Sequence, residues 1–287
     1  MAEFTVHFDG PITVEHKLSI RVLGNTYEHM QRSIDRAYLI NKYGHVRKHQ
    51  RLSALDYENT EFLGEYPVEG GIILTAFKDG AERIIDRVHA AILPIFENAV
   101  SDTFQQHESI SAQLGQRKEY VHGMGHNTRS FESVQADPPP NWASGYSNRS
   151  VIKEIDQLVG QITPERVESS TVDITLIGSR PHLPLVFDEW IARNFHVIAS
   201  QRDLGPPMSV RASIRSLDRG NRTTRPNAKI LNIDSGKEVS LHLSNLSDVD
   251  ELHPYHNGGE VVLYVSPIIE ALGFDMIGGD LHYLAIA

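Results

Sequence analysis

The carboxy-terminal half of the chain contains five short segments with the apolar pattern of β-strands. The second and third are joined by Asp234-Ser235-Gly236, and a tight Gly-containing turn between two such runs is typical of a β-hairpin. Five short strands that close on themselves leave no exposed sheet edge. We therefore predict a small SH3-like or OB-like barrel, built from residues 209–217, 228–233, 237–243, 261–265 and 281–286.

The amino-terminal half combines strand and helix patterns. Residues 3–8 alternate polar and apolar side chains before the turn Asp9-Gly10-Pro11, which predicts a strand. From residue 25 to residue 40 the apolar positions recur every three or four residues, which predicts an amphipathic helix ending near Gly44. Residues 61–67 and 71–77 predict a hairpin. The fold class expected is α+β, with a small amino-terminal sheet and amphipathic helices.

A helical pattern also follows Asp79 and continues as far as residue 119. One uninterrupted helix of that extent would be ~60 Å long, although Pro94 should kink or break it. Such a helix outreaches the small domain before it, so its far half needs a partner. This predicts contact with the carboxy-terminal domain or with a second copy of the chain in a homo-oligomer.

The periodicity disappears in residues 122–150, which contain Pro138-Pro139-Pro140 and a stretch rich in Ser, Asn and Gly. This composition predicts a linker between an α+β domain at 1–121 and a β-rich barrel domain at 151–287. The segment also carries Phe131, Trp142 and Tyr146, which a disordered spacer seldom needs. We therefore expect it to be partly ordered against a partner or a neighbouring domain.

The charge of the chain is unevenly distributed. The net charge is −10, which opposes binding to polyanions, but residues 42–51 hold four basic side chains and no acid, and residues 211–229 hold six against Asp218. These segments carry about +9, so the remainder carries about −19. Arginine suits phosphate recognition. The predicted site for nucleic acid or another anionic ligand comprises Arg211, Arg215, Arg219, Arg222, Arg225 and Lys229, with Arg47, Lys48 and Arg51 from the first segment.

The alternative interpretation is that these arginines form ion pairs with the many carboxylates of this acidic chain. Two other clusters favour a different class of protein, a metal-dependent hydrolase or nuclease. The simpler interpretations are that the first cluster is a solvated loop and that the residues of the second cap strand ends. The first cluster consists of Asp248, Asp250, Glu251, His253 and His256, and the second of Asp9, Glu15 and Lys17.

Several signatures of well-known enzymes are missing from the sequence. Cysteine is absent, which excludes disulfides, thiolate nucleophiles and Cys-ligated metals. Gly123-Met-Gly125 lacks the third glycine of a dinucleotide-binding loop, and the chain contains neither a Gly-x-Ser-x-Gly nor a His-Glu-x-x-His motif. These absences favour a binding protein over an enzyme and predict no cofactor.

The amino terminus has neither the basic nor the apolar region of a secretory signal. The longest apolar runs, 72–77 and 261–265, have the length of strands and fall far short of the ~20 residues that a membrane span needs. We expect a cytoplasmic protein with no membrane span.

Three stretches carry a resemblance to other proteins: Phe8-Asp-Gly-Pro-Ile-Thr-Val-Glu-His-Lys-Leu, Tyr27-Glu-His-Met-Gln-Arg-Ser-Ile-Asp-Arg-Ala-Tyr38 and Glu69-Gly-Gly-Ile-Ile-Leu-Thr75. Over about the first 120 residues the chain resembles bacterial proteins associated with phage-defence loci. The resemblance implies a sensor of infection or an adaptor for an effector protein. Our leading hypothesis is a non-enzymatic binding and assembly protein, with an acidic protein as an alternative partner of the arginines.

Overall fold

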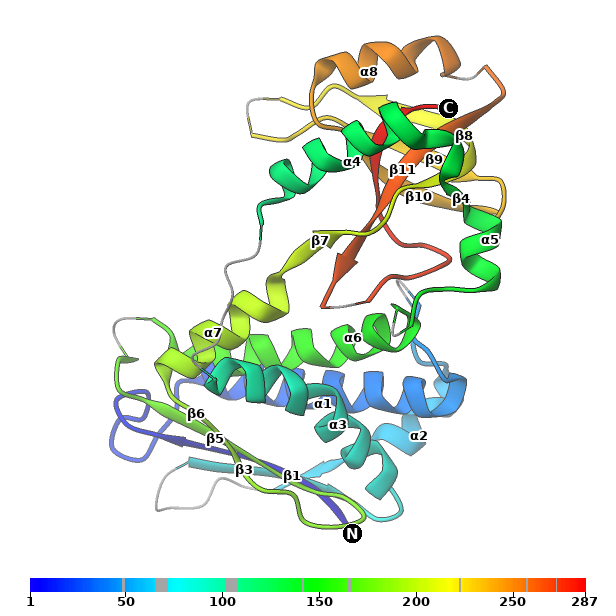
Figure 1. Ribbon diagram of the computed structural model, residues 1–287. Helices are drawn as coiled ribbons and strands as arrows, with labels where there is room; N and C mark the ends of the chain where they lie inside the picture. The colour runs from blue at the N-terminus through cyan, green and yellow to red at the C-terminus, as the bar shows by residue number, and fades with distance from the viewer. Residues whose placement is uncertain are drawn as a thin grey trace. The chain divides into compact units, whose positions relative to one another are not determined.

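The structure is a computed structural model of residues 1–287. It describes the chain apart from residues 48–49, 66–71, 102–107, 141, 165–166, 222, 257 and 272. The chain divides into two compact units (Figure 1). Unit 1 comprises Met1–Gln105 and Ser147–Gln201, and unit 2 comprises Gln106–Tyr146 and Arg202–Ala287.

Unit 1 is built on a five-stranded antiparallel sheet in the order β2, β3, β1, β5, β6. Its strands are β1 (Ala2–Asp9), β2 (Leu63–Gly64), β3 (Ile72–Lys78), β5 (Thr171–Ile177) and β6 (Leu185–Phe187). The alternation predicted for the first strand is present, since Phe4, Val6 and Phe8 are buried while the residues between them are partly exposed. The sheet therefore buries one face.

Four longer helices lie on the same side of this sheet in Figure 1. They are α1 (Ile20–Tyr43), α3 (Glu82–Val100), α6 (Trp142–Val159) and α7 (Glu189–Ser200). The helix α1 begins after Ser19, whose side chain accepts a hydrogen bond from the Val22 amide, and ends at Gly44 with φ of 75°. The short elements η1 (Ala54–Asp56) and α2 (Tyr57–Thr60) follow it.

The helical pattern expected over residues 80–119 forms two separate helices. The first, α3, continues through Pro94 and ends where Ser101 is extended, with ψ of 131°. The second, α4 (Ile110–Met124), begins after Ser109, whose side chain accepts from the Ala112 amide. The two helices belong to different units, so the chain has no single long helix whose far half would need a second copy of the chain as its partner.

The boundaries of the two units differ from those predicted at 121 and 150. The strand β5 pairs with β1 along its length, from Glu3 opposite Ile177 to Asp9 opposite Thr171, so residues 147–201 belong to unit 1. Residues 122–146 belong to unit 2, where Phe131 and Trp142 are buried in the hydrophobic core. The segment expected to be a linker thus contains η2 (Gly125–Asn127), β4 (Arg129–Ser130), α5 (Phe131–Ala136) and the start of α6.

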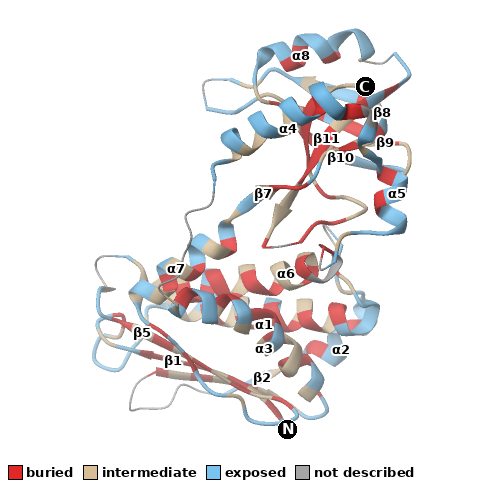
Figure 2. Cartoon of the chain, viewed as in Figure 1, coloured by how far each residue is buried: buried red, intermediate tan, exposed pale blue. Residues whose placement is uncertain are grey.

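Unit 2 contains the predicted small barrel. Five strands close through the pairings β8–β9, β9–β10, β10–β12, β12–β11 and β11–β8. The barrel strands are β8 (Met208–Asp218), β9 (Asn227–Asn232), β10 (Lys237–His242), β11 (Glu260–Glu270) and β12 (Leu281–Ile286). Their inward side chains, such as Val210, Ile230 and Leu263, form the core, and red buried stretches occur along the barrel strands in Figure 2.

The strand order decides between the two predicted barrel types. Numbered from β8, the order is 1-2-3-5-4-1, and the third and fifth strands, β10 and β12, are parallel. The helix α8 (Leu246–Leu252) connects the third strand to the fourth. This is the arrangement of an OB-type Greek-key barrel, whose ligands contact the second and third strands and the loop between the first two. The arginine-rich loop between β8 and β9 occupies that loop position.

Candidate anion-binding site

The loop between β8 and β9 has a defined conformation where the structure describes it. The side chain of Asn221 accepts hydrogen bonds from the amides of Thr223 and Thr224, at 2.8 and 3.0 Å. Gly220 has φ of +68°, and a Cβ atom there would lie 2.4 Å from the Thr224 carbonyl oxygen. Asp218 accepts from the Gly220 amide. The loop is therefore folded by its own polar groups, which positions the arginine at its end.

Two of the predicted binding arginines are paired with acids. The guanidinium of Arg211 lies 2.6 Å from the carboxylate of Asp234, and that of Arg219 lies 2.6 Å from Asp250. The hydrogen bond to Asp234 raises the pKa of Arg211. For these two side chains the interpretation as ion pairs is correct, and their positive charge is largely neutralised.

Arg215, Arg225 and Lys229 differ from that pair. All three are exposed, and none has an acidic partner among the residues that the structure describes. Lys229 projects from the outer face of β9 and donates a hydrogen bond to the Ser240 hydroxyl of β10 at 2.9 Å. Arg215 lies in the irregular part of β8, where the register with β9 shifts. We define these three residues as the free cations of the barrel. Arg222 lies outside the described residues.

A pocket of about 470 Å³ in unit 2 is lined by one of the free cations, Arg225. It lies between the first turn of α4, the short strand β7 (Arg202–Leu204) and the ends of β10, β11 and β12. The basic side chains in its wall are Arg202, Arg225, His242 and His282. Its other wall residues are Ser109, Ile110, Ser111, Leu204, Leu243 and Ile268, so no carboxylate lines it among the described residues.

Sequence reasoning missed His242 and His282 as members of this site. The two residues are 40 positions apart in the sequence, but they are direct neighbours in the parallel pairing of β10 with β12. No local sequence pattern predicts that two strands will pair in parallel when a helix and another strand lie between them in the chain. Arg225 was predicted as a binding residue, because the positive charge of residues 211–229 is visible in the sequence itself.

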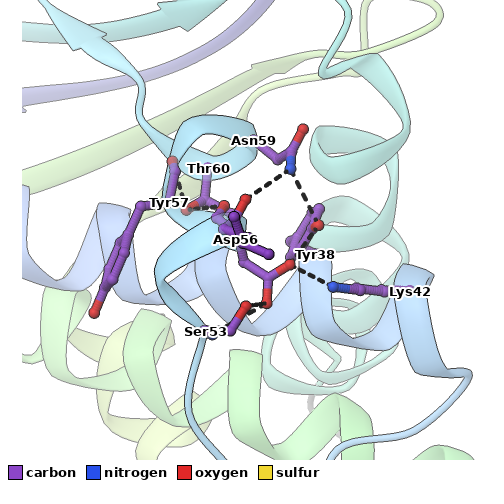
Figure 3. A network of polar contacts seen from close by, with 8 residues as sticks. Tyr38, Lys42, Ser53, Asp56, Tyr57, Asn59 and Thr60 are labelled. Carbon is purple, nitrogen blue, oxygen red and sulfur yellow. Dashed lines mark hydrogen bonds and ion pairs between the residues drawn. The ribbon is translucent and has the colours of Figure 1, made fainter.

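The first basic segment lies in unit 1 and has a different structure. Lys42 contacts the carboxylate of Asp56, which is 2% exposed and also accepts from the Tyr38 hydroxyl at 2.9 Å and the Ser53 hydroxyl at 2.7 Å (Figure 3). The Lys42 ammonium lowers the pKa of Asp56, and Asp56 raises the pKa of Lys42. This network fastens η1 and α2 to α1, so Lys42 has a structural role.

The predicted site residues of that segment are not gathered with those of the barrel, because they belong to the other unit. Arg47 donates from Nε to the His45 ring at 3.1 Å. Arg51 is exposed, and no partner is recorded for it in the described part of the chain. Lys48 lies outside the described residues.

The acidic clusters do not assemble into metal sites. Asp248 accepts from the Lys118 ammonium at 3.1 Å and from the Ser244 amide at 2.7 Å, whereas Asp250 pairs with Arg219. In the second cluster Asp9 accepts from the Gly10 amide, and Glu15 pairs with Lys17 at 3.8 Å on the surface. Within the described ranges no three His, Asp or Glu side chains could hold a metal ion, and His253 and His256 join no such group.

Unit 1 contains a second pocket, of about 610 Å³, beside the ends of α6 and α7. There the His196 ring lies 3.0 Å from the carboxylate of Asp156, which is 7% exposed. Burial raises the pKa of Asp156. Neither residue was predicted from the sequence, because 40 positions separate them. The pair holds a buried carboxylate, and no nucleophilic side chain bonds to His196 among the described residues.

Comparisons with known proteins found no match. The chain matches no protein-family model, and neither a curated protein nor a solved structure is similar to it. Among the described residues, no helix has both the length and the apolar content to cross a bilayer.

Proposed function

We propose that unit 2 binds single-stranded nucleic acid through the outer face of β8, β9 and β10 and the loop between β8 and β9. The observation that carries the proposal is the position of the free cations. Arg225 ends the loop, Lys229 lies on the second barrel strand and Arg215 on the first. In an OB-type barrel this loop and these strands are the surface that contacts oligonucleotides.

The chemistry of this surface favours contacts to phosphates over contacts to bases. The outward residues of β9 are Asn227, Lys229 and Leu231, and those of β10 are Glu238, Ser240 and His242. None of them is a Phe, Tyr or Trp, on which bases stack in most single-strand binding proteins. We therefore expect binding with little sequence preference and a strong dependence on salt.

The resemblance to bacterial defence proteins fits the same proposal. A sensor or adaptor in antiviral defence would use such a surface to recognise nucleic acid. An acidic protein is the competing occupant of the same cations. If it is the partner, an unrelated oligonucleotide should not bind to them.

Fluorescence anisotropy with a labelled single-stranded oligonucleotide tests the proposal. Lys229→Glu should weaken binding about tenfold, because it replaces a phosphate contact with a repulsion. Lys237→Glu is the matched control, since Lys237 alternates with the buried Val239 and Leu241 and is not one of the outward residues of β10. Equal effects of the two variants, or no binding by the wild-type protein at low salt, would contradict the proposal.

A further inference from the structure

The pocket beside α4 has a composition that the nucleic-acid surface does not require. The pocket lies against β10 and β12, and its other walls come from the helix α4 and the strand β7. Neither of these two elements is part of the barrel. Arg225 and His242 belong to both regions, but α4 and β7 lie outside the strands proposed to bind nucleic acid. A volume of about 470 Å³ is in the range of small-molecule sites.

The wall of the pocket is rich in groups that bind anions. Arg225 and Arg202 contribute guanidinium groups, and the Nε atom of Arg202 is held 2.8 Å from Glu270. His242 lies 3.7 Å from Asp280. The first turn of α4 adds the amides of Ile110 and Ser111, which have no partners within the helix. Arg202 and His242 thus lie beside acids that do not line the pocket, and Arg225 supplies the guanidinium of the wall that has no acidic partner among the described residues.

His282 adds a feature that plain anion binding does not explain. Its side chain lines the pocket although the residue is only 6% exposed. Its Nδ1 atom lies 3.2 Å from the Tyr283 carbonyl oxygen, which can only accept, so Nδ1 carries the proton and donates. The neutral ring then offers Nε2 as an acceptor, and no hydrogen bond to Nε2 is recorded within the described residues. Burial lowers the pKa of His282, which favours this neutral form.

We propose that this pocket binds a phosphomonoester. A monoester near neutral pH carries one or two negative charges for the cationic wall, and in its singly protonated form it has an O–H that can donate to Nε2 of His282. A phosphodiester inside a strand has one charge and no such proton. Two kinds of molecule carry such a phosphomonoester: a free mononucleotide and a nucleic-acid strand with a phosphorylated end.

Isothermal titration calorimetry with inorganic phosphate and with sulfate tests this proposal at pH 6.5. Sulfate has a similar size and charge but no proton to donate, so phosphate should bind at least tenfold more tightly. Arg225→Gln should weaken both anions about tenfold. The matched control is Arg219→Gln in the same loop, because Arg219 pairs with Asp250 and does not line the pocket.

A variant of the buried histidine then tests the role of Nε2. His282→Leu should reduce the preference for phosphate over sulfate to less than about twofold, since it removes the only acceptor in question. Its thermal unfolding is measured in parallel, and the exposed Arg225→Gln keeps the proposal testable if the leucine variant does not fold. Equal binding of the two anions by the wild-type protein, or no effect of Arg225→Gln, would overturn the proposal.

Oligonucleotides separate this pocket from the nucleic-acid surface. Thymidine 5′-monophosphate, a 5′-phosphorylated dT oligomer and the same oligomer with a 5′-hydroxyl are compared. Tight binding of the mononucleotide identifies a free nucleotide as the source, and a gain only for the phosphorylated oligomer identifies a strand end. If the 5′-hydroxyl oligomer binds as well as the phosphorylated one and phosphate does not bind, the pocket proposal fails while the nucleic-acid proposal stands.

Discussion

The two basic segments both carry an excess of positive charge, but their side chains have different surroundings in the folded chain. In unit 1, Lys42 is held by the buried carboxylate of Asp56. In unit 2, Arg211 and Arg219 are paired, while Arg215, Arg225 and Lys229 have no acidic partner in the described structure. A basic side chain is therefore available to an anionic ligand only where the fold brings no acid to it, as at the three free cations of the barrel.

The largest effect is expected for Asp56→Ala. The substitution removes the acceptor of hydrogen bonds from Tyr38, Lys42 and Ser53, and leaves those donors without their buried partner. Thermal unfolding followed by circular dichroism should show a midpoint lowered by several degrees. Asp250→Ala is the control, because Asp250 and Arg219 are both 63% exposed and their pair contributes little. Similar midpoints for the two variants would contradict the structural role of Asp56.

Charge reversals in the two segments should separate binding from structure. Arg215→Glu should weaken the affinity for a single-stranded oligonucleotide about tenfold, because Arg215 is a free cation on the barrel. Arg47→Glu should change it less than about twofold, since Arg47 lies in unit 1. The dissociation constants come from anisotropy at one fixed salt concentration. A larger effect of Arg47→Glu would place the binding surface in the first segment.

Removing an acid should convert a paired arginine into a free one. Asp250→Asn releases Arg219 at the edge of the proposed surface, and the affinity for the oligonucleotide should rise two- to threefold, roughly the value of one exposed ion pair. Surface plasmon resonance at low salt measures this change. An unchanged affinity would mean that Arg219 does not face the bound strand.

The smallest effect concerns the buried carboxylate of Asp156 in unit 1. Burial raises the pKa of Asp156 above its unfolded value, so the stability that its protonated form contributes is present below the unfolded pKa and is lost as the pH rises through the folded pKa. Asp156→Asn cannot ionise and should raise the unfolding free energy at pH 7 by less than about 1 kcal/mol. Urea titrations at pH 7 and pH 4 should show this gain shrinking at pH 4.

The barrel and its charged loop were predictable because their signals are local. Alternating strands, the turn Asp234-Ser235-Gly236 and the charge of residues 211–229 all lie within short stretches of the sequence. Long-range pairing was not predictable. The position of residues 147–201 in unit 1 depends on the pairing of β5 with β1, and the pocket depends on the pairing of His242 with His282. Whether each arginine is paired depends on acids such as Asp234 and Asp250, which lie close to the arginines only in the folded chain.

The salt dependence of oligonucleotide binding tests the central claim most directly. If the three free cations each neutralise one phosphate, a plot of log K against log salt concentration should have a slope of about −2 for the wild-type protein. The double variant Arg215→Glu, Lys229→Glu should bring the slope to within about 0.7 of zero. A slope near zero for the wild-type protein, or one that the double variant leaves unchanged, would contradict the account.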